Sequence, residues 1–398
     1  MRDFLLWKNA NKWFYASSTA ATWIWAPAIF VSSDKAYFNG VWGFLMFLIP
    51  NIMTLVLFAY FAEMGRNKID GFTIVDAIAN AGDGQKRLHL AVSVIVLICS
   101  TCVQILGLHT LFAAWFELPK WLTAMTVSVL AITMVGRSGI KGSIQTDAVK
   151  YVVMFLAGVA LLVPTVQACP DIRLTGMYDS SFMEMAAVFG VSTAIGLFSA
   201  PYVDQTFWQR VFSMPHGEVK SIFFRSAVLF ALIPLLFGLI GFYQVSEDPK
   251  WSIAQAFSSS TLNIVLALCV IAALLSTLDS NLCAVASLAC REFGCSINSG
   301  RAAMVTLLTA GSLVMIMTTT TITDLFLLYG TIRTCVALPT ILIILGRYDK
   351  QRLFYSTLLG ILIAPVGFVL CSDYRWLFTL LALVMPALGF TKCKERAK

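Results

Sequence analysis

Long apolar stretches separated by short polar segments recur along the whole chain. At about 1.5 Å per helical residue, a stretch of roughly 20 apolar residues crosses the ~30 Å hydrocarbon core of a bilayer. Twelve such spans are expected, at about residues 12–31, 40–64, 88–115, 119–136, 144–167, 184–211, 220–245, 258–290, 301–319, 322–346, 352–371 and 374–390. A short amphipathic segment, residues 72–81, is expected at the cytoplasmic interface. The pattern predicts an all-α integral membrane protein in which residues 1–398 form one transmembrane domain.

The composition also indicates a membrane protein, because 59% of the 398 residues are hydrophobic and only 12% are charged. A soluble domain carries about 25% charged residues. The lipid bilayer is therefore an expected partner, in a multi-pass arrangement in the cell or inner membrane. Ten cysteines are scattered along the chain, and the closely spaced Cys99 and Cys102 lie within an apolar run. We interpret this pair as small buried hydrophobic residues rather than metal ligands.

The positive charges are distributed unevenly between two sets of loops. If the N-terminus lies inside, 20 of the 28 Lys and Arg residues fall in inner segments and 5 in outer loops, with Lys150, Arg225 and Arg333 within spans. This imbalance follows the positive-inside rule, so both termini are predicted to be cytoplasmic. Membrane topology therefore accounts for the net charge of +7, and no nucleic-acid partner is expected.

Two spans contain residues that are unfavourable in a plain helix. The first has Ser17, Ser18, Thr19 and Pro27, and the sixth has Gly190, Ser192, Thr193, Gly196, Ser199 and Pro201. These spans open two halves of five spans each, residues 12–167 and 184–346, and two extra helices follow at 350–390. Interrupted spans at matching positions indicate an inverted-repeat transporter, in which broken helices line a central site. A simple proline kink in each span is the alternative.

The eighth span carries a polar stripe at bilayer depth. Ala273, Ser276, Thr277 and Ser280 fall on one helical face, and Asp279 lies beside them. A carboxylate in the membrane costs a few kcal/mol, about 2.5–3.5 by insertion scales, unless it meets an ion, a cavity or a partner. Because hydroxyl and carboxylate oxygens suit hard cations, we predict a cation site here. Alternatively, the hydroxyls bond back to the helix and Asp279 pairs with a neighbouring base.

Three stretches carry a resemblance to a known family. They are GIKGSIQTDAVKYVVM at 139–154, VDQTFWQRVFS at 203–213 and LLSTLDSNLCAVASLACREF at 274–293. Together they resemble the sodium/solute symporters, which share the inverted-repeat fold of the bacterial leucine transporter. The first and sixth spans look nearest to the urea and polyamine transporter branch. The family's usual topology places one more helix ahead of the core than this sequence shows.

The resemblance implies two sites for Na⁺. The first would use the Ser17, Ala20 and Ala273 carbonyls and the hydroxyls of Ser276 and Thr277. Some family members hold a second sodium, and the positions that match its ligands here are Asp147, Asp279 and Ser280. Lys150 lies one turn from Asp147, where the family often has glutamine. A structural ion pair is therefore the alternative to a second sodium.

A substrate is expected near the bilayer midplane, between the broken spans. The candidate substrate residues are Thr19, Trp23, Trp25, Gln104, Phe198, Ser199, Asp204, Phe326 and Tyr329, with Phe207 as an inner gate by family analogy. Spans 1, 3 and 6 contain no lysine or arginine away from their ends, which argues against a side-chain anchor for a carboxylate, although backbone amides at the broken helix are an alternative anchor. Asp204 can accept from an amide or amine, and its alternative partner is Arg210 or a helix end.

These features predict a transporter rather than an enzyme, because no nucleophile–base or His/acid constellation appears in the sequence. We expect a sodium-coupled symporter that imports a small polar, nitrogen-containing solute by alternating access, with urea-like or amide-like compounds favoured. One alternative is a proton-coupled transporter of the same fold for amino acids or polyamines. A membrane sensor or channel is a more remote alternative.

Overall fold

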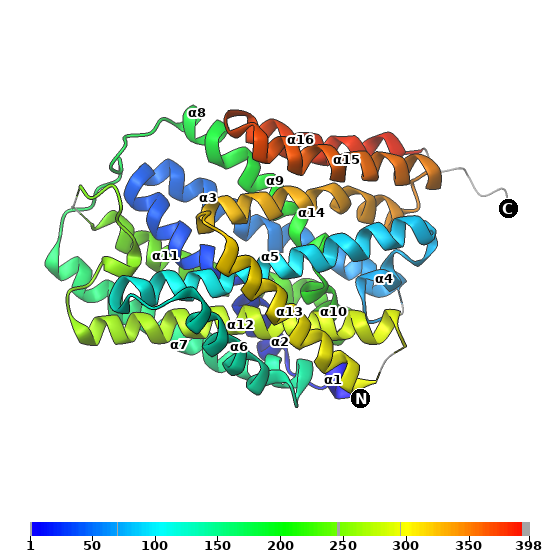
Figure 1. Cartoon of the computed structure of the whole chain (residues 1–398), viewed down its shortest axis with the longest axis horizontal. Helices are drawn as coiled ribbons and strands as arrows, with labels where there is room; N and C mark the ends of the chain where they lie inside the picture. Colours follow the sequence, from blue (N-terminus) through cyan, green and yellow to red (C-terminus); the bar gives the residue numbers. More distant parts are fainter. Residues whose placement is uncertain (1, 70, 245–246, 295, 392–398) are drawn as a thin grey trace.

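The computed structural model describes residues 2–69, 71–244, 247–294 and 296–391, and these form a bundle of helices (Figure 1). The helices are α1 (Arg2–Leu5), α2 (Lys12–Trp23), α3 (Ala26–Lys68), α4 (Ile74–Ala77), α5 (Asp83–Phe116), α6 (Lys120–Val135), α7 (Gly139–Ala168), α8 (Phe182–Met185), α9 (Val191–Val203), α10 (Gln205–Ser213), α11 (Val219–Phe242), α12 (Ser260–Glu292), α13 (Ile297–Met317), α14 (Ile322–Leu345), α15 (Lys350–Leu370) and α16 (Arg375–Val384). Shorter helical turns are η1 (Ala79–Ala81), η2 (Ala186–Gly190), η3 (Ile253–Gln255), η4 (Ser372–Tyr374) and η5 (Met385–Gly389).

The twelve expected spans all have helical counterparts in the described residues. Within the part of the chain that the structure describes, nine helices are long and apolar enough to cross a membrane, with α8, η2 and α9 counted as one. The other three spans come from the division of α3 into two, from the shorter α6, and from α16 with η5. The all-α, multi-pass architecture predicted from the hydrophobic pattern is confirmed.

The chain turns inside α3 at Gly40, which separates the first span from the second. Gly40 has φ 63°, a left-handed conformation that favours glycine. A Cβ atom here would also overlap the backbone of Leu174 and Thr175, which lies directly against the turn. The next residue, Val41, donates its amide to the Leu174 carbonyl at 2.8 Å. The turn therefore needs glycine both for its conformation and for this close approach.

The first and sixth spans are both broken, as the interruptions predicted. In the first, α2 ends at Trp23 and α3 begins at Ala26, with Ile24 and Trp25 in extended or irregular conformations. Pro27 lies in the first turn of α3, where a missing amide is tolerated. In the sixth, Asp204 has an extended backbone between α9 and α10. The polar run Ser17–Thr19, by contrast, lies within the regular part of α2 rather than in the break.

The loops gather at two opposite ends of the bundle. At one end, which we call the α4 end, Asp76 pairs with Arg291, Asn80 accepts from Tyr348, and Lys12 pairs with Glu218. Figure 1 shows α1 and α4 toward the same end of the long axis. The inner loops inferred from the charge pattern thus lie together. That this end faces the cytoplasm stays a prediction, and the cationic tail at 392–398 lies outside the described residues.

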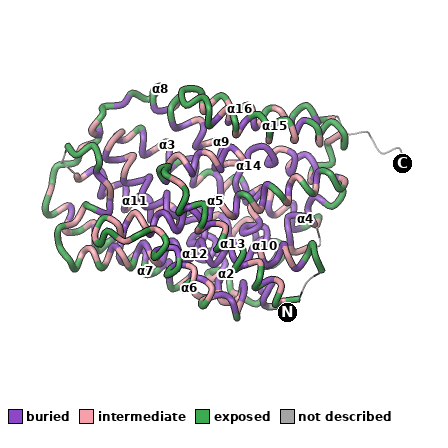
Figure 2. Tube along the Cα trace, in the orientation of Figure 1, coloured by how far each residue is buried: buried purple, intermediate pink, exposed green. Residues whose placement is uncertain are grey.

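Exposed apolar side chains cover the outside of the bundle, while the buried residues gather around α2, α10 and α12 (Figure 2). On α7, for example, Val149, Leu156 and Val163 are exposed, whereas Asp147 and Lys150 are buried. This is the inverse of a soluble protein, in which charges face outward. The distribution fits a chain whose outer surface meets lipid.

Helices α9 and α14 approach closely where two glycines face each other. A Cβ atom at Gly196 would lie 3.2 Å from the Cα atom of Gly330, which is tighter than ordinary packing. Small residues at such crossings let helix backbones approach in a membrane. The contact holds the middle of α9, the helix that leads to Asp204, against the part of α14 that carries Tyr329.

We expect Gly196→Ala to destabilise the protein by about 1 kcal/mol or more, because the added methyl group meets backbone that cannot rotate away. The matched control is Gly360→Ala on α15, where a Cβ atom would be at an ordinary 3.8 Å from Met385. Unfolding of the detergent-solubilised variants, followed by tryptophan fluorescence, measures the difference. Equal stability of the two variants would contradict close packing at Gly196.

The short segment expected at residues 72–81 forms α4 and η1, and Asp76 holds α4 in place. Its carboxylate accepts hydrogen bonds from the Phe72 and Thr73 amides and pairs with Arg291 of α12 at 2.7 Å. Burial raises the pKa of Asp76, but these hydrogen bonds and the Arg291 charge outweigh it and hold the pKa below its usual 3.8. The carboxylate therefore stabilises the folded state as long as it stays ionised.

Asp76→Ala is expected to destabilise the protein by about 1–2 kcal/mol, because it removes a helix-capping group and an ion pair. Since the folded-state pKa is lowered, this contribution is fully present above the unfolded pKa and is lost as the pH falls through the folded pKa. The difference from wild type should thus be the same at about pH 6 and about pH 8. Denaturation at both pH values tests this, with the exposed Asp83→Ala as the control. A difference that changes between these two pH values would contradict the assignment.

Candidate ion and substrate sites

Helix α12 lies inside the bundle, and its predicted polar stripe faces protein. Ser276, Thr277, Asp279 and Ser280 are all buried, against α2, α7 and α10. The alternative prediction was that these hydroxyls bond to carbonyls of their own helix, and this holds only in part. Ser280 Oγ does donate to the Ser276 carbonyl at 2.8 Å. Ser276 and Thr277 instead reach other helices, so the stripe links α12 to its neighbours.

Thr277 meets the break in the first span. Its Oγ1 donates to the carbonyl oxygens of Thr22 at 3.2 Å and Ile24 at 3.4 Å, at the point where α2 ends. These carbonyls lack helical partners further along the chain because the helix stops there. The Thr277 hydroxyl of α12 therefore meets one carbonyl from the end of α2 and one from the break itself, and Ala273, one turn earlier on α12, is also fully buried.

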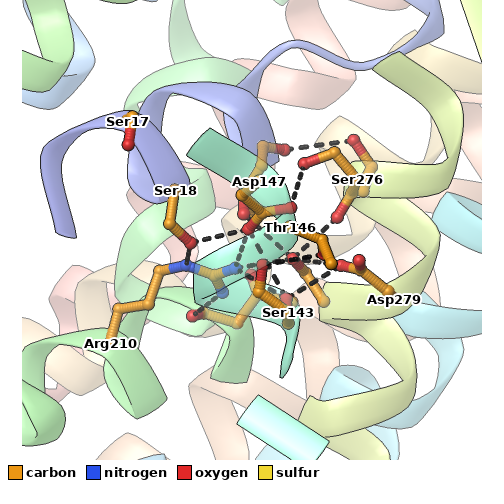
Figure 3. Close-up of polar contacts among 12 residues, drawn as sticks. Ser17, Ser18, Ser143, Thr146, Asp147, Arg210, Ser276 and Asp279 are labelled. Carbon is orange, nitrogen blue, oxygen red and sulfur yellow. Dashed lines mark hydrogen bonds and ion pairs between the residues drawn. The ribbon is translucent and has the colours of Figure 1, made fainter. Parts of the chain in front are cut away.

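The other two carbonyl groups predicted as sodium ligands, those of Ser17 and Ala20, lie earlier in α2. The Ala20 carbonyl accepts the amide of Ile24 at 2.9 Å, so it closes the last turn of the helix. Ser17 donates its hydroxyl to the Trp13 and Phe14 carbonyls. Figure 3 draws Ser17 on α2 without a contact to the other residues of the polar network. In this conformation Thr277 is thus joined to Thr22 and Ile24 rather than to Ser17 and Ala20.

Asp147 of α7 is fully buried and surrounded by donors (Figure 3). Its Oδ1 accepts from Ser276 at 2.6 Å and lies 3.5 Å from Lys150 Nζ. Its Oδ2 accepts from Ser18 at 2.6 Å and from Arg210 at 3.1 Å. One carboxylate therefore joins α2, α7, α10 and α12.

Asp279 is also fully buried, and Lys150 lies between it and Asp147. Asp279 Oδ2 pairs directly with Lys150 Nζ, while Oδ1 accepts from Ser143 at 2.9 Å and from Ser280 at 3.3 Å. The residues predicted for a second sodium are thus brought together, but each carboxylate already has a basic partner. This arrangement corresponds to the structural ion pair that the sequence left as an alternative.

Arg210 of α10 completes the network, with a fully buried guanidinium. Besides Asp147, it donates to Ser18 at 3.1 Å, to Ser280 at 2.7 Å and to the Thr206 carbonyl at 3.1 Å. Two aspartates and two basic residues therefore share this region, and their charges cancel. Arg210 is not the partner of Asp204, which was one of the alternatives from the sequence.

Asp204, at the break of the sixth span, pairs instead with Arg333 of α14 at 3.4 Å. The Arg333 guanidinium lies 4.3 Å from the centre of the Tyr329 ring and 5.6 Å from that of Trp25. Three buried polar atoms here, Trp25 Nε1, Tyr329 Oη and Arg333 Nε, have no hydrogen-bond partner among the described residues. Buried polar groups in proteins are normally paired. This cluster therefore has the character of a polar binding site.

Aromatic rings surround the cluster on both sides. Trp25 stacks on Trp23 at 5.4 Å and contacts Phe326 edge-on at 5.2 Å. Phe207, the predicted gate, contacts Trp23 edge-on at 5.2 Å from α10. The predicted aromatic residues other than Phe198 thus form one continuous group, made of Trp23, Trp25, Phe207, Phe326 and Tyr329.

The remaining predicted substrate residues take different positions. Gln104 of α5 accepts the amide of Ala26 at 2.9 Å, so it caps the newly started α3. The Thr19 hydroxyl is buried and has no partner among the described residues. Ser199 donates to the Ile195 carbonyl of its own helix, and Phe198 is half-buried. Only Thr19 of these four offers a free polar atom.

Sequence reasoning missed Arg333 and the partners of Arg210. Arg333 and Arg210 are basic residues in or next to a span, where an ionisable side chain is a functional candidate by default. That rule could have identified Arg333 as part of the site. No signal in the sequence indicated which carboxylate each arginine would meet, because that depends on how the helices rotate against one another.

No family model matches the chain. A probable urea active transporter 1 of Schizosaccharomyces pombe is 24% identical over 254 residues, which covers 56% of this chain and 37% of that protein. The chain thus spans little more than a third of the length of this curated relative.

Solved structures resemble the whole chain. A substrate-bound, outward-open Na⁺-coupled sialic acid symporter has a TM-score of 0.72 at 15% identity, covering 98% of this chain and 91% of that one. MhsT in complex with L-phenylalanine has a TM-score of 0.60 at 13% identity, covering 97% and 99%. Mhp1, a nucleobase-cation-symport-1 family transporter, has a TM-score of 0.59 at 13% identity, covering 97% and 94%.

These proteins are all transporters, and the structural matches share the leucine-transporter fold that the resemblance implied. The likeness to a urea transporter adds a sequence match that is independent of fold. The chain therefore has the fold of these multi-pass membrane transporters, and part of its sequence resembles a probable urea active transporter.

Proposed function

We propose that the protein is a sodium-coupled symporter that imports a small, polar, nitrogen-containing solute by alternating access. The observation that carries this proposal is the convergence of Thr277 with the Thr22 and Ile24 carbonyls where the broken first span meets α12. Urea-like or amide-like solutes are the favoured substrates.

The distances between these oxygens suit a monovalent cation of the size of Na⁺. A hard cation of similar radius, Ca²⁺, holds oxygen ligands at about 2.3–2.6 Å, so ligands at right angles lie about 3.3–3.7 Å apart. Thr277 Oγ1 is 3.2 Å and 3.4 Å from the two carbonyl oxygens. We assign Na⁺ to this position, with the Ala273 carbonyl and the Ser276 hydroxyl completing the ligands from α12. The Thr22 and Ile24 carbonyls take the place of those of Ser17 and Ala20.

Sodium at this position would join α2 to α12 and so favour one arrangement of the bundle. A ligand shifts a conformational equilibrium only by its difference in affinity for the two states. Because the carbonyls come from a helix break, movement of α2 would separate them from Thr277 and release the ion. Inward sodium movement gains ~2.3 kcal/mol per charge for every 100 mV of membrane potential, which can drive solute accumulation.

The substrate proposal rests on the polar cluster around Arg333. Trp25 Nε1, Tyr329 Oη and Arg333 Nε offer donors for a carbonyl oxygen, and Asp204 offers an acceptor for N–H groups. Urea and simple amides carry both kinds of group and are neutral, which suits a site where the Arg333 and Asp204 charges already cancel. The sequence likeness to a probable urea transporter points the same way.

A second candidate follows from the same ion pair. An amino acid carries a carboxylate and an ammonium group, and these could separate Arg333 from Asp204 and pair with one each. This candidate corresponds to the amino-acid alternative from the sequence. Uptake assays with urea, acetamide, amino acids and spermidine would distinguish the two.

Thr277→Ala is expected to raise the sodium concentration for half-maximal uptake about tenfold or more, because a ligand of a charged group contributes about 1.5–3 kcal/mol. Uptake of radiolabelled solute into proteoliposomes, with sodium replaced by choline or lithium at fixed pH, measures this effect. Thr309→Ala is the matched control, since Thr309 is exposed on α13 and bonds only to its own helix. Concentrative uptake by the wild type without sodium, driven by a proton gradient, would refute sodium coupling.

Tyr329→Phe removes a single hydroxyl from the Arg333 cluster and keeps the ring. We expect the KM for the transported solute to rise about tenfold, because the hydroxyl would lose one hydrogen bond to the bound solute. The sodium dependence should not change, since Tyr329 lies apart from Thr277 on α14. Tyr355→Phe, an exposed tyrosine on α15, is the control. An unchanged KM with a full substrate panel would remove Tyr329 from the binding site.

A further inference from the structure

We propose that Lys150 is a built-in cation that fills a second monovalent cation position between α7 and α12, and that its removal would create a new cation-binding site there. The inference deepens the proposed function, because it fixes the number of ions that the protein can hold. It concerns the carboxylates of Asp147 and Asp279, which are not among the ligands assigned to Na⁺ beside Thr277, and the Ser276 hydroxyl lies between the two positions.

The charges around Lys150 are already balanced. Asp147 and Asp279 are fully buried, and Lys150 and Arg210 are their basic partners among the described residues. With both bases present the charges cancel. An additional Na⁺ would leave one uncompensated positive charge at bilayer depth, which is strongly unfavourable. Without Lys150, the same region would hold one uncompensated negative charge.

The carboxylate oxygens of Asp147 and Asp279 already accept hydrogen bonds from protein donors. Asp147 accepts from Ser18, Ser276 and Arg210, and Asp279 accepts from Ser143 and Lys150. An ionised carboxylate has about four acceptor positions, so the lone pairs of both residues are largely used. A metal ion entering this space would have to displace donors that are already in place.

Of the two bases, Lys150 is the one that a free ion can replace. Arg210 of α10 bonds to Ser18 of α2, Asp147 of α7 and Ser280 of α12, so it links four helices. It also donates to the Thr206 carbonyl of its own helix. Among the described residues, Lys150 Nζ, in contrast, is paired with the two carboxylates of Asp147 and Asp279. An ammonium group is a compact point charge, so it resembles a monovalent ion more closely than a planar guanidinium does.

The groups that would surround a replacing ion are all oxygens. Removal of the ammonium leaves Asp147 Oδ1 and Asp279 Oδ2 facing one space, with the Ser276 hydroxyl bonded to the first and Ser143 bonded to the other oxygen of Asp279. Carboxylate and hydroxyl oxygens are the ligands of hard cations. The chain therefore retains the ligand set of a cation site but occupies it with its own side chain.

The test counts bound sodium in Lys150→Gln, which removes the charge and keeps a polar side chain. Equilibrium binding of ²²Na⁺ to purified protein near neutral pH is expected to rise by one ion per molecule relative to wild type. Lys150→Arg keeps the charge and should show no increase. In the double variant Lys150→Gln/Asp279→Asn the charges cancel again, so it should also show no increase.

The inference is tested by the difference in bound sodium between Lys150→Gln and wild type, whatever number of ions the wild type binds. One ion in wild type and two in Lys150→Gln support both the inference and the proposed sodium coupling. No ion in wild type and one in the variant support the inference and refute the coupling. A folded Lys150→Gln protein with no increment overturns the inference. If this variant folds in sodium, lithium or potassium chloride but not in choline chloride, the inference is supported. If none of these salts restores folding, the inference is overturned.

Discussion

The structure depends on the balance of charge at one point inside the membrane. Asp147, Asp279, Lys150 and Arg210 come from three helices, and each would be costly alone in a low-dielectric interior. Together they are neutral and almost fully hydrogen-bonded, so α7, α10 and α12 are held in one relative position. The hydroxyl of Ser18 adds α2 to the same assembly. The oxygen-lined position that we assign to Na⁺ lies next to this fixed point, because Ser276 is bonded to Asp147 and precedes Thr277 on α12.

The second constraint is the broken main chain. Each break leaves backbone amides and carbonyls without helical partners, and a membrane offers no water to satisfy them. In the first span, Gln104 takes the free amide of Ala26, and Thr277 meets the free carbonyls of Thr22 and Ile24. The same residues that repair the break therefore create the oxygen-lined position that we assign to Na⁺. The proposed ion binding would thus use the same contacts that satisfy the broken backbone.

Much of this architecture could be predicted from the sequence. Hydrophobic length gave the spans, Pro27 and Pro201 indicated the broken pair, and the stripe on α12 indicated Ser276 and Thr277. The pairing of Arg210 with Asp147 and of Arg333 with Asp204 could not be predicted, because it depends on helix rotation and on contacts across distant parts of the chain. The contact of Thr277 with the Thr22 and Ile24 carbonyls could not be predicted for the same reason.

Gln205, directly after the break at Asp204, donates to the Phe72 carbonyl and to Ser287 of α12, and accepts the amide of Ile74 at the start of α4. The first residue of α10 is therefore anchored both to the surface segment around α4 and to α12. Any displacement of the main chain at the break would have to break these hydrogen bonds or move α4 with it, so the break is mechanically tied to the end of the bundle where α4 lies.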